Sequence, residues 1–163
     1  MEKILIAVDN SKYLDKILDY LAHIFKERED VTLTFFHIKK PCFVFDDLIS
    51  ENIDKDLLLQ KIEELRRNKK MCKIESEKIV NQIREKINIF SQKLGKIRPK
   101  VEFEATEETE DYATTILKKA DEIGAKTIIV GRKGDSIVSE YLIGSTADKL
   151  VRITKDKTIW LIE

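Results

Sequence analysis

The sequence has little glycine, proline, cysteine or histidine, and it carries no excess of either charge. Its 163 residues include five glycines, two prolines, two cysteines and two histidines, and thirty basic residues balance thirty acidic ones. A structural zinc site needs a cluster of thiolate or imidazole ligands, and Cys42, Cys72, His23 and His37 are too few and too scattered to supply one. A general nucleic-acid binder needs a surplus of lysine and arginine, so the balanced charge argues against one.

Long apolar runs are missing as well. No run approaches the roughly 18 residues that a membrane span requires. The first residues lack the basic start, the longer apolar core and the small-residue cleavage site of a signal peptide. We therefore expect a soluble, cytoplasmic protein with no membrane span. Because disulfides are rare in that compartment, we expect Cys42 and Cys72 to be free thiols rather than joined to each other.

The length leaves room for one domain, residues 1–163, and the 42% of hydrophobic residues is enough for a core. Five short apolar runs predict strands. The first and fourth of them are continuous rather than alternating, which is typical of strands covered on both faces. The five predicted strands are residues 4–8, 31–38, 100–105, 127–130 and 158–162.

Helical spacing of apolar residues separates these strands. Residues 13–27 carry one apolar stripe, with Ser11 as the expected N-cap. Residues 109–123 repeat the pattern and end at Gly124, where we expect a left-handed C-cap. A last helix is predicted over residues 144–153. Strands that alternate with helices indicate right-handed crossovers, and hence an α/β fold with a single doubly wound parallel sheet.

Residues 46–94 are longer than one crossover requires. Ile79, Ile83 and Ile87 mark a helical stripe in the second part, and the first part has a stripe of its own. Residues 66–70, between them, have no apolar member. One uninterrupted helix over residues 53–94 would be about 60 Å long, so we expect a break near residues 66–70 and a helical insertion over about 46–70. The basic run is interpreted as a solvated face.

Three of the five glycines lie close together at the carboxyl end of the fourth predicted strand. Gly131 and Gly134 are followed, after nine residues, by Gly144 at the start of the last helix. Glycines allow a backbone to approach a ligand and to adopt positive φ, and the first amides of a helix bind anions. Arg132, Ser145 and Thr146 add a cation and two hydroxyls. This cluster favours a bound polyphosphate, although it matches neither the P-loop nor the Rossmann dinucleotide loop.

The spacing Gly-x2-Gly-x9-Gly-Ser resembles the ATP-binding signature of the universal stress protein family. The resemblance extends over most of the chain. Residues 4–11 (ILIAVDNS) are similar to the first strand and turn of the family, residues 35–38 (FFHI) to the end of the second strand, and residues 125–163 to the carboxyl-terminal third. It implies a five-stranded sheet of order 3-2-1-4-5 with helices on both faces.

The resemblance also implies roles for individual residues. Asp9 would contact the adenine or ribose, the backbone of Ile38 would bind the adenine edge, and ATP, ADP or AMP would be accompanied by Mg²⁺ or Mn²⁺. The implied nucleotide-binding residues are Ala7, Val8, Asp9, Ile38, Val130, Gly131, Arg132, Gly134, Gly144, Ser145 and Thr146. Asn10 replaces a frequent glycine, and residues 155–157 replace a turn that often contains proline; neither departure removes a ligand group.

Several of these residues have a structural alternative. Asp9 could cap the following helix instead of contacting a ligand, and His37 is interpreted as a structural histidine rather than a base. Asp135 and Glu140 could help to bind a metal ion, or could be solvated loop residues. Phosphoryl transfer needs a residue that positions or deprotonates the nucleophile, and the sequence offers no clear base and thus no assigned catalytic residue.

The sequence therefore predicts an adenine-nucleotide-binding regulatory protein of the stress response, which acts as a nucleotide-dependent switch or as a partner-binding module. The alternatives are a slow ATPase or a nucleotidyl-transferring enzyme of the same superfamily, and a family member that binds no ATP. Residues 158–162 are strongly β-prone and would lie at the sheet edge in the implied order. We expect a homodimer that pairs through them, in addition to a protein partner that the sequence does not identify.

Overall fold

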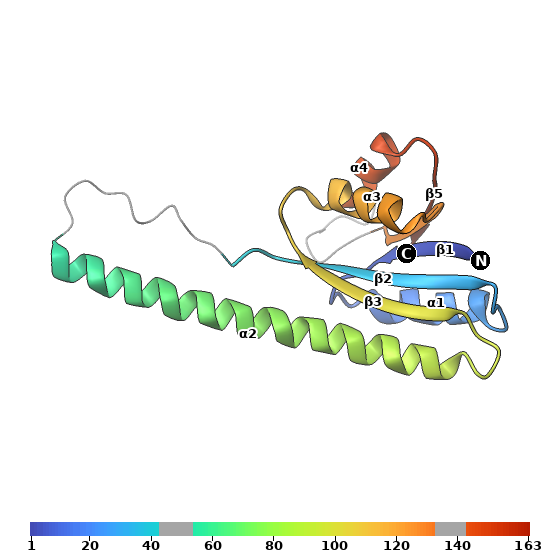
Figure 1. Ribbon diagram of the computed structural model, residues 1–163, viewed down its shortest axis with the longest axis horizontal. Helices are drawn as coiled ribbons and strands as arrows, with labels where there is room; N and C mark the ends of the chain where they lie inside the picture. Colours follow the sequence, from blue (N-terminus) through green and yellow to red (C-terminus); the bar gives the residue numbers. More distant parts are fainter. Residues whose placement is uncertain (43–53, 133–142) are drawn as a thin grey trace.

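One five-stranded sheet forms the centre of the molecule (Figure 1). The computed structural model describes residues 1–42, 54–132 and 143–163. The strand order is β3-β2-β1-β4-β5, and every neighbouring pair is parallel. The expected class and order are thus confirmed. The strands are β1 (Glu2–Ala7), β2 (Val31–Lys39), β3 (Lys100–Glu107), β4 (Thr127–Gly131) and β5 (Thr158–Ile162).

Helices cover both faces of the sheet. Helices α1 (Leu14–Phe25) and α2 (Lys55–Lys93) lie on one face, and α3 (Tyr112–Ile123) and α4 (Ser145–Ile153) lie on the other (Figure 1). Strand β1 serves both cores, because successive side chains of a strand point to opposite faces. Ile4 and Ile6 pack with α1 and α2, whereas Leu5 packs with α3 and α4. This two-sided burial explains the continuous apolar run.

The predicted carboxyl end of α3 is right, but α3 begins at Tyr112 rather than at residue 109, and the predicted N-cap of α1 is wrong. Gly124 ends α3 in the left-handed conformation, with φ of 71°, as its position after the apolar stripe indicated. Ser11 is not the N-cap of α1, which begins after Tyr13 without a side-chain cap. Instead, the Ser11 hydroxyl accepts a hydrogen bond from the Tyr13 amide over 3.3 Å, so Ser11 stabilises the turn that precedes the helix.

Helix α2 is continuous over 39 residues, so the expected break near residues 66–70 is wrong. At 1.5 Å per residue the helix is about 58 Å long. Its buried residues are Val80, Ile83, Ile87 and Phe90, and the half that precedes them extends beyond the sheet (Figure 1). Arginine and lysine are good helix formers, so a run without apolar residues removes packing but does not end the helix. Within the described residues, no helix has the length and apolarity needed to cross a membrane.

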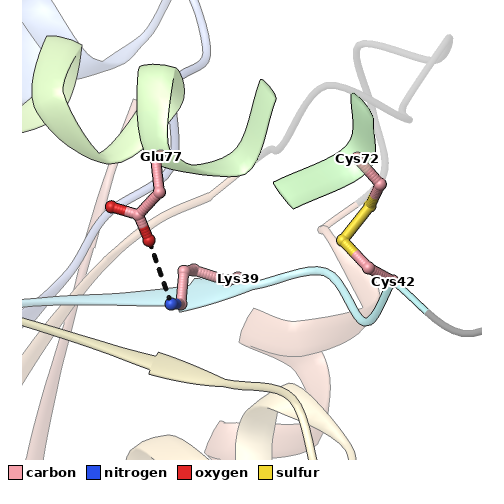
Figure 2. The surroundings of a disulfide bond; sticks show 4 residues. All are labelled: Lys39, Cys42, Cys72 and Glu77. Atoms are coloured by element: carbon pink, nitrogen blue, oxygen red, sulfur yellow. Dashed lines mark hydrogen bonds and ion pairs between the residues drawn. A yellow bond between two sulfur atoms is a disulfide. The ribbon is translucent and has the colours of Figure 1, made fainter. Parts of the chain in front are cut away.

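A disulfide joins Cys42 to Cys72, so the expectation of free thiols is wrong. Cys42 lies just beyond β2, and Cys72 lies in the extended half of α2, with 5.7 Å between the two Cα atoms. The Nζ atom of Lys39 lies 3.4 Å from Oε1 of Glu77, in the adjoining turn of the same helix (Figure 2). The chain that leaves β2 therefore contacts α2 at two successive points.

Candidate functional site

The candidate site lies at the carboxyl edge of the sheet, where β1 separates β2 from β4. Ala7, the last residue of β1, is in register with Phe36 of β2 and with Val130 of β4. The crossover from β1 leads to β2 on one side, and β4 lies on the other side. Ligands of open parallel sheets bind at such a switch in strand order. The topology therefore brings the strand-end candidates together, namely Ala7, Val8, Asp9, Ile38, Val130 and Gly131.

The backbone of Ile38 faces an open position at this edge. The β1–β2 ladder ends at Ala7 and Phe36, and the Val8 amide then donates to the Phe36 carbonyl oxygen over 2.9 Å. Alternate residues of a strand direct their backbone groups to the same side, so the N–H and C=O of Ile38 also point toward the β1 side. No strand residue in the described part of the chain pairs with them there. These two groups can recognise the donor and acceptor edge of a planar base.

Asp9 holds the turn that follows β1. Its Oδ1 atom accepts a hydrogen bond from the Ser11 amide over 3.1 Å, and its side chain is exposed. The structure thus supports the capping alternative for one carboxylate oxygen, while the exposed carboxylate remains accessible to a ligand. Next to it, Nδ2 of Asn10 donates to Oε1 of Gln82 over 2.9 Å. The turn at the site is therefore linked directly to α2.

His37 has a structural contact, as predicted. Its Nδ1 atom lies 2.9 Å from the carbonyl oxygen of Val8. A carbonyl oxygen can only accept, so Nδ1 must carry the proton and donate. Burial lowers the pKa of His37 below its ordinary value, although the Val8 carbonyl and the charge of Asp9 oppose that effect. The neutral ring therefore joins the ends of β1 and β2 beneath the site.

The start of α4 lies against the end of β4. The Gly144 amide donates to the carbonyl oxygen of Arg132 over 2.7 Å, and the Arg132 amide donates to Ile162 over 2.7 Å. Gly144 is the N-cap of α4, and no side chain of residues 1–42, 54–132 or 143–163 caps this helix. The first amides of a helix have no partner within it, so those of Ser145 and Thr146 are available to an anion. The chain thus places an uncapped helix N-terminus beside Gly131.

The two described glycines of the candidate site, Gly131 and Gly144, do not have positive φ. Among the described glycines, only Gly95 and Gly124 have positive φ, so Gly131 does not use the positive φ that glycine allows. Gly144 has φ of −58°. Gly134, together with the candidate metal ligands Asp135 and Glu140, lies outside the described residues. In the part of the chain that is described, no three histidine, cysteine, aspartate or glutamate side chains gather into a metal site.

Arg132 already has an anionic partner. Its Nη1 atom lies 2.8 Å from Oε2 of Glu163, which directly follows β5. The Arg132 side chain is 27% exposed and that of Glu163 is 61% exposed. An ion pair that is this accessible to water is weak, so a phosphate group can compete with Glu163 for the guanidinium.

Two residues at the start of α3 were missed in the sequence. Asp111 caps α3 through the Thr114 amide, and hydrogen bonds from Thr114 and Lys149 lower its pKa to about 2. Burial, followed by the charges of Glu108 and Asp9, raises the pKa of Tyr112, so Tyr112 lies within electrostatic reach of the site. The order of the elements could have indicated these residues, because α3 follows β3 and must therefore begin at the carboxyl edge of the sheet. Since Asp111 occupies the N-terminus of α3, α4 offers the open amides.

The comparisons with known proteins agree with this architecture. The profile of the Universal stress protein family matches residues 1–156. The hypothetical protein MJ0577, whose structure was used for assignment of biochemical function, is 16% identical, with a TM-score of 0.70 and coverage of 99% of this chain and 94% of that one. No curated protein sequence matches significantly.

Two further structures contain bound nucleotides. A universal stress protein in complex with cAMP is 17% identical, with a TM-score of 0.55 and coverage of 99% of this chain and 97% of that one. The universal stress protein from Archaeoglobus fulgidus in complex with dAMP is 15% identical, with a TM-score of 0.53 and coverage of 100% and 98%. At these identities, the likeness concerns the fold.

Proposed function

We propose that this chain, which belongs to the universal stress protein family, binds an adenine nucleotide at the carboxyl edge of its sheet and acts as a nucleotide-dependent regulator. The observation that carries the proposal is the uncapped N-terminus of α4, which the hydrogen bond between Gly144 and Arg132 places beside Gly131. Free helix amides and the positive end of the helix dipole favour a phosphate group. Two structures of the same fold contain cAMP and dAMP.

Each part of the nucleotide has a proposed contact. The open backbone groups of Ile38 bind the adenine edge, and Ala7, Val8 and Val130 line the base and ribose positions. Asp9 hydrogen-bonds the ribose through its exposed carboxylate. Gly131, Gly134, Gly144, Ser145 and Thr146 hold the phosphate chain, with Arg132 as the cation. ATP is the proposed ligand, and Mg²⁺ or Mn²⁺ would be held by its phosphates.

We expect nucleotide binding to affect the last strand, β5, and thereby the surface that other molecules contact. A phosphate chain that attracts Arg132 weakens its ion pair with Glu163, and Glu163 directly follows the edge strand β5. We expect β5 to pair with its own copy in a homodimer, so nucleotide occupancy would be sensed at the dimer edge. The resulting change of surface is what a downstream protein partner in the stress response would recognise.

Isothermal titration calorimetry on nucleotide-stripped protein tests the proposal directly. We expect saturable binding of ATP, ADP or AMP, and weaker binding of GTP, because the backbone pattern at Ile38 matches the adenine edge. Mass spectrometry of nucleotide released from freshly purified protein is an independent measurement. No heat with any adenine nucleotide at millimolar concentration would overturn the proposal.

A further inference from the structure

The extended half of α2, residues 55–79, has no fully buried residue, and its apolar residues Leu58, Ile62 and Leu65 are only partly buried. The first residue of α2 that is buried is Val80. Leu57, Leu59, Met71 and Ile74, which precede it, are all exposed. Residues 55–79 are about 37 Å long at 1.5 Å per residue, and they extend beyond the sheet (Figure 1). Most helices in proteins are stabilised by packing of an apolar face, so this half depends on other restraints.

Among the described residues, an ion pair and a disulfide join this half of α2 to the end of β2 (Figure 2). One is the ion pair between Lys39 and Glu77, in which the Glu77 side chain is 62% exposed. Ion pairs that are this exposed contribute little to stability. The other is the Cys42–Cys72 disulfide, which is covalent. The disulfide is therefore the stronger of the two links.

We propose that Cys42 and Cys72 form a thiol–disulfide exchange site whose redox state sets the helical order of residues 55–76. Both cysteines are partly exposed, so a small thiol can approach the bond. Lys69 lies one turn before Cys72 on the same helix, and Lys73 follows it directly. Cations near a sulfur favour its thiolate, and a stabilised thiolate is a better leaving group in exchange.

The reaction partner is a dithiol reductant. One of its thiolates attacks a sulfur of the Cys42–Cys72 bond, which breaks, and a mixed disulfide forms while the other cysteine leaves as a thiolate. The second thiol of the reductant then attacks the mixed disulfide and releases the second cysteine. In total, two electrons and two protons pass to the protein, and the reductant leaves as its own disulfide. A disulfide oxidant reverses the sequence.

Reduction removes the covalent restraint from a segment that contains a run of basic residues. Arg66, Arg67, Lys69, Lys70 and Lys73 lie within two turns of helix and are all exposed. Like charges that are three or four residues apart destabilise a helix. Residues 80–93 keep their packing, because Val80, Ile83, Ile87 and Phe90 remain in the core. Unfolding should therefore begin at the tip and stop near Glu77.

Limited trypsin digestion of the full chain tests the proposal, with dithiothreitol as the dithiol and a thiol-specific chromophore to count free cysteines. After reduction without denaturant, we expect cleavage at Arg66, Arg67, Lys69 and Lys70 to become about tenfold faster, as expected for local unfolding. Cleavage at Arg84 and Lys86, in the packed half, should not change. Hydrogen exchange should show the same boundary near Glu77.

Variants show whether the faster cleavage results from loss of the disulfide or from another effect of the reductant. Cys42→Ser and Cys72→Ser should each give the fast cleavage without reductant, and should not respond to it. Met71→Ser, a change at the exposed neighbour of Cys72, should keep the wild-type response. A bond that dithiothreitol reduces only in denaturant would overturn the exchange site. Reduction without faster cleavage, or a Met71→Ser variant that is cleaved as fast as the cysteine variants, would overturn the control of helical order.

Discussion

The amide of Gly144 lies 2.7 Å from the carbonyl oxygen of Arg132, and this hydrogen bond places the start of α4 at the end of β4. Gly144 has φ of −58°, a value that any residue can adopt. The glycine is therefore not required by the backbone. We expect the absence of a side chain to leave room for a phosphate beside the first amides of α4, and this expectation can be tested.

Substitution of Gly144 should affect stability and nucleotide binding in opposite directions. Aspartate is a good N-cap, so Gly144→Asp should leave the fold as stable as before or stabilise it by a few tenths of a kcal/mol. The same carboxylate would occupy the amides and repel phosphate, so ATP affinity should fall by more than about tenfold, or about 1.4 kcal/mol. Thermal unfolding and calorimetry measure the two effects, and Gly144→Asn separates occupation of the site from charge.

Gly124 provides the matched control. It has φ of 71° at the end of α3, and an added Cβ would meet no atom within 4 Å. Gly124→Ala should therefore cost about 1–2 kcal/mol through conformation alone, with unchanged ATP affinity. If Gly144→Asp bound ATP as well as the unmodified chain does, the anion site would not be at α4.

The pH dependence of stability should reveal His37. Burial lowers its pKa in the folded state, so the unfolded chain binds a proton more readily than the folded chain does. Stability should therefore be fully present above the ordinary histidine pKa of about 6.5, and should fall as the pH decreases through the lower folded value. His37→Asn keeps an N–H donor for Val8 but does not titrate. Denaturant unfolding between pH 7 and about pH 5 should be flatter in this variant.

His23 is the control for this measurement, because it is the second histidine and is exposed on α1. His23→Asn should keep the pH dependence of the unmodified protein. A profile that is flattened by His23→Asn and unchanged by His37→Asn would contradict the assignment.

Any hydrolysis of ATP should be slow. His37 already donates to Val8, and Asp9 already accepts from Ser11. His37 cannot serve as a base without loss of its contact, and Asp9 uses one carboxylate oxygen to hold the turn after β1. We expect turnover below about 1 per second, against about 10 per second for a typical enzyme, measured as phosphate release under saturating Mg²⁺ and ATP. A faster rate that Asp9→Asn, Asp135→Asn or Glu140→Gln abolished would identify an enzyme.

The dimer can be tested with two proline variants of β5. The Thr158 amide donates to Lys126, so by alternation the backbone of Trp160 faces β4 and that of Leu161 faces the open edge. Trp160→Pro removes a ladder hydrogen bond and the stacking on Phe25, whose ring centroid is 6.2 Å away. It should destabilise the fold by about 3–5 kcal/mol, as large-to-small core changes do. Leu161→Pro should instead separate the dimer.

Light scattering and circular dichroism distinguish these outcomes. The unmodified chain should have twice the mass of one chain at tens of micromolar, and Leu161→Pro the mass of one folded chain. An unmodified chain that is monomeric under these conditions would exclude the dimer and its role as the output of the switch.

The strands and the site edge could be predicted because the pattern of apolar residues in a strand shows which of its faces are buried. The run at residues 4–8 is apolar on both faces, and Gly131 follows a second such run, so the parallel sheet places both at one edge. Ser11 was misassigned because a hydroxyl can cap either a helix or the preceding turn. Tyr112 was missed because it was interpreted only as part of the apolar stripe of its helix, although the start of α3 had to lie at the same edge as Asp9.

The errors on α2 have a different origin. Residues 66–70 lack apolar side chains, which indicates that nothing packs on them but does not determine whether they are helical. The partnership of Cys42 and Cys72 depends on the path of the chain after Lys39, which runs along α2. Neither the number of cysteines nor the expected cellular compartment indicates which path the chain takes after Lys39.

The division of α2 into a packed part and an extended part makes the helix a lever. Its pivot lies near Gln82, whose hydrogen bond to Asn10 joins it to the turn after β1. A tilt of about 10° at that point would displace the tip by about 7 Å over an arm of about 40 Å between Gln82 and Lys55. Because the Cys42–Cys72 disulfide ties this arm to the end of β2, such a tilt would reach the tip only after that bond is broken.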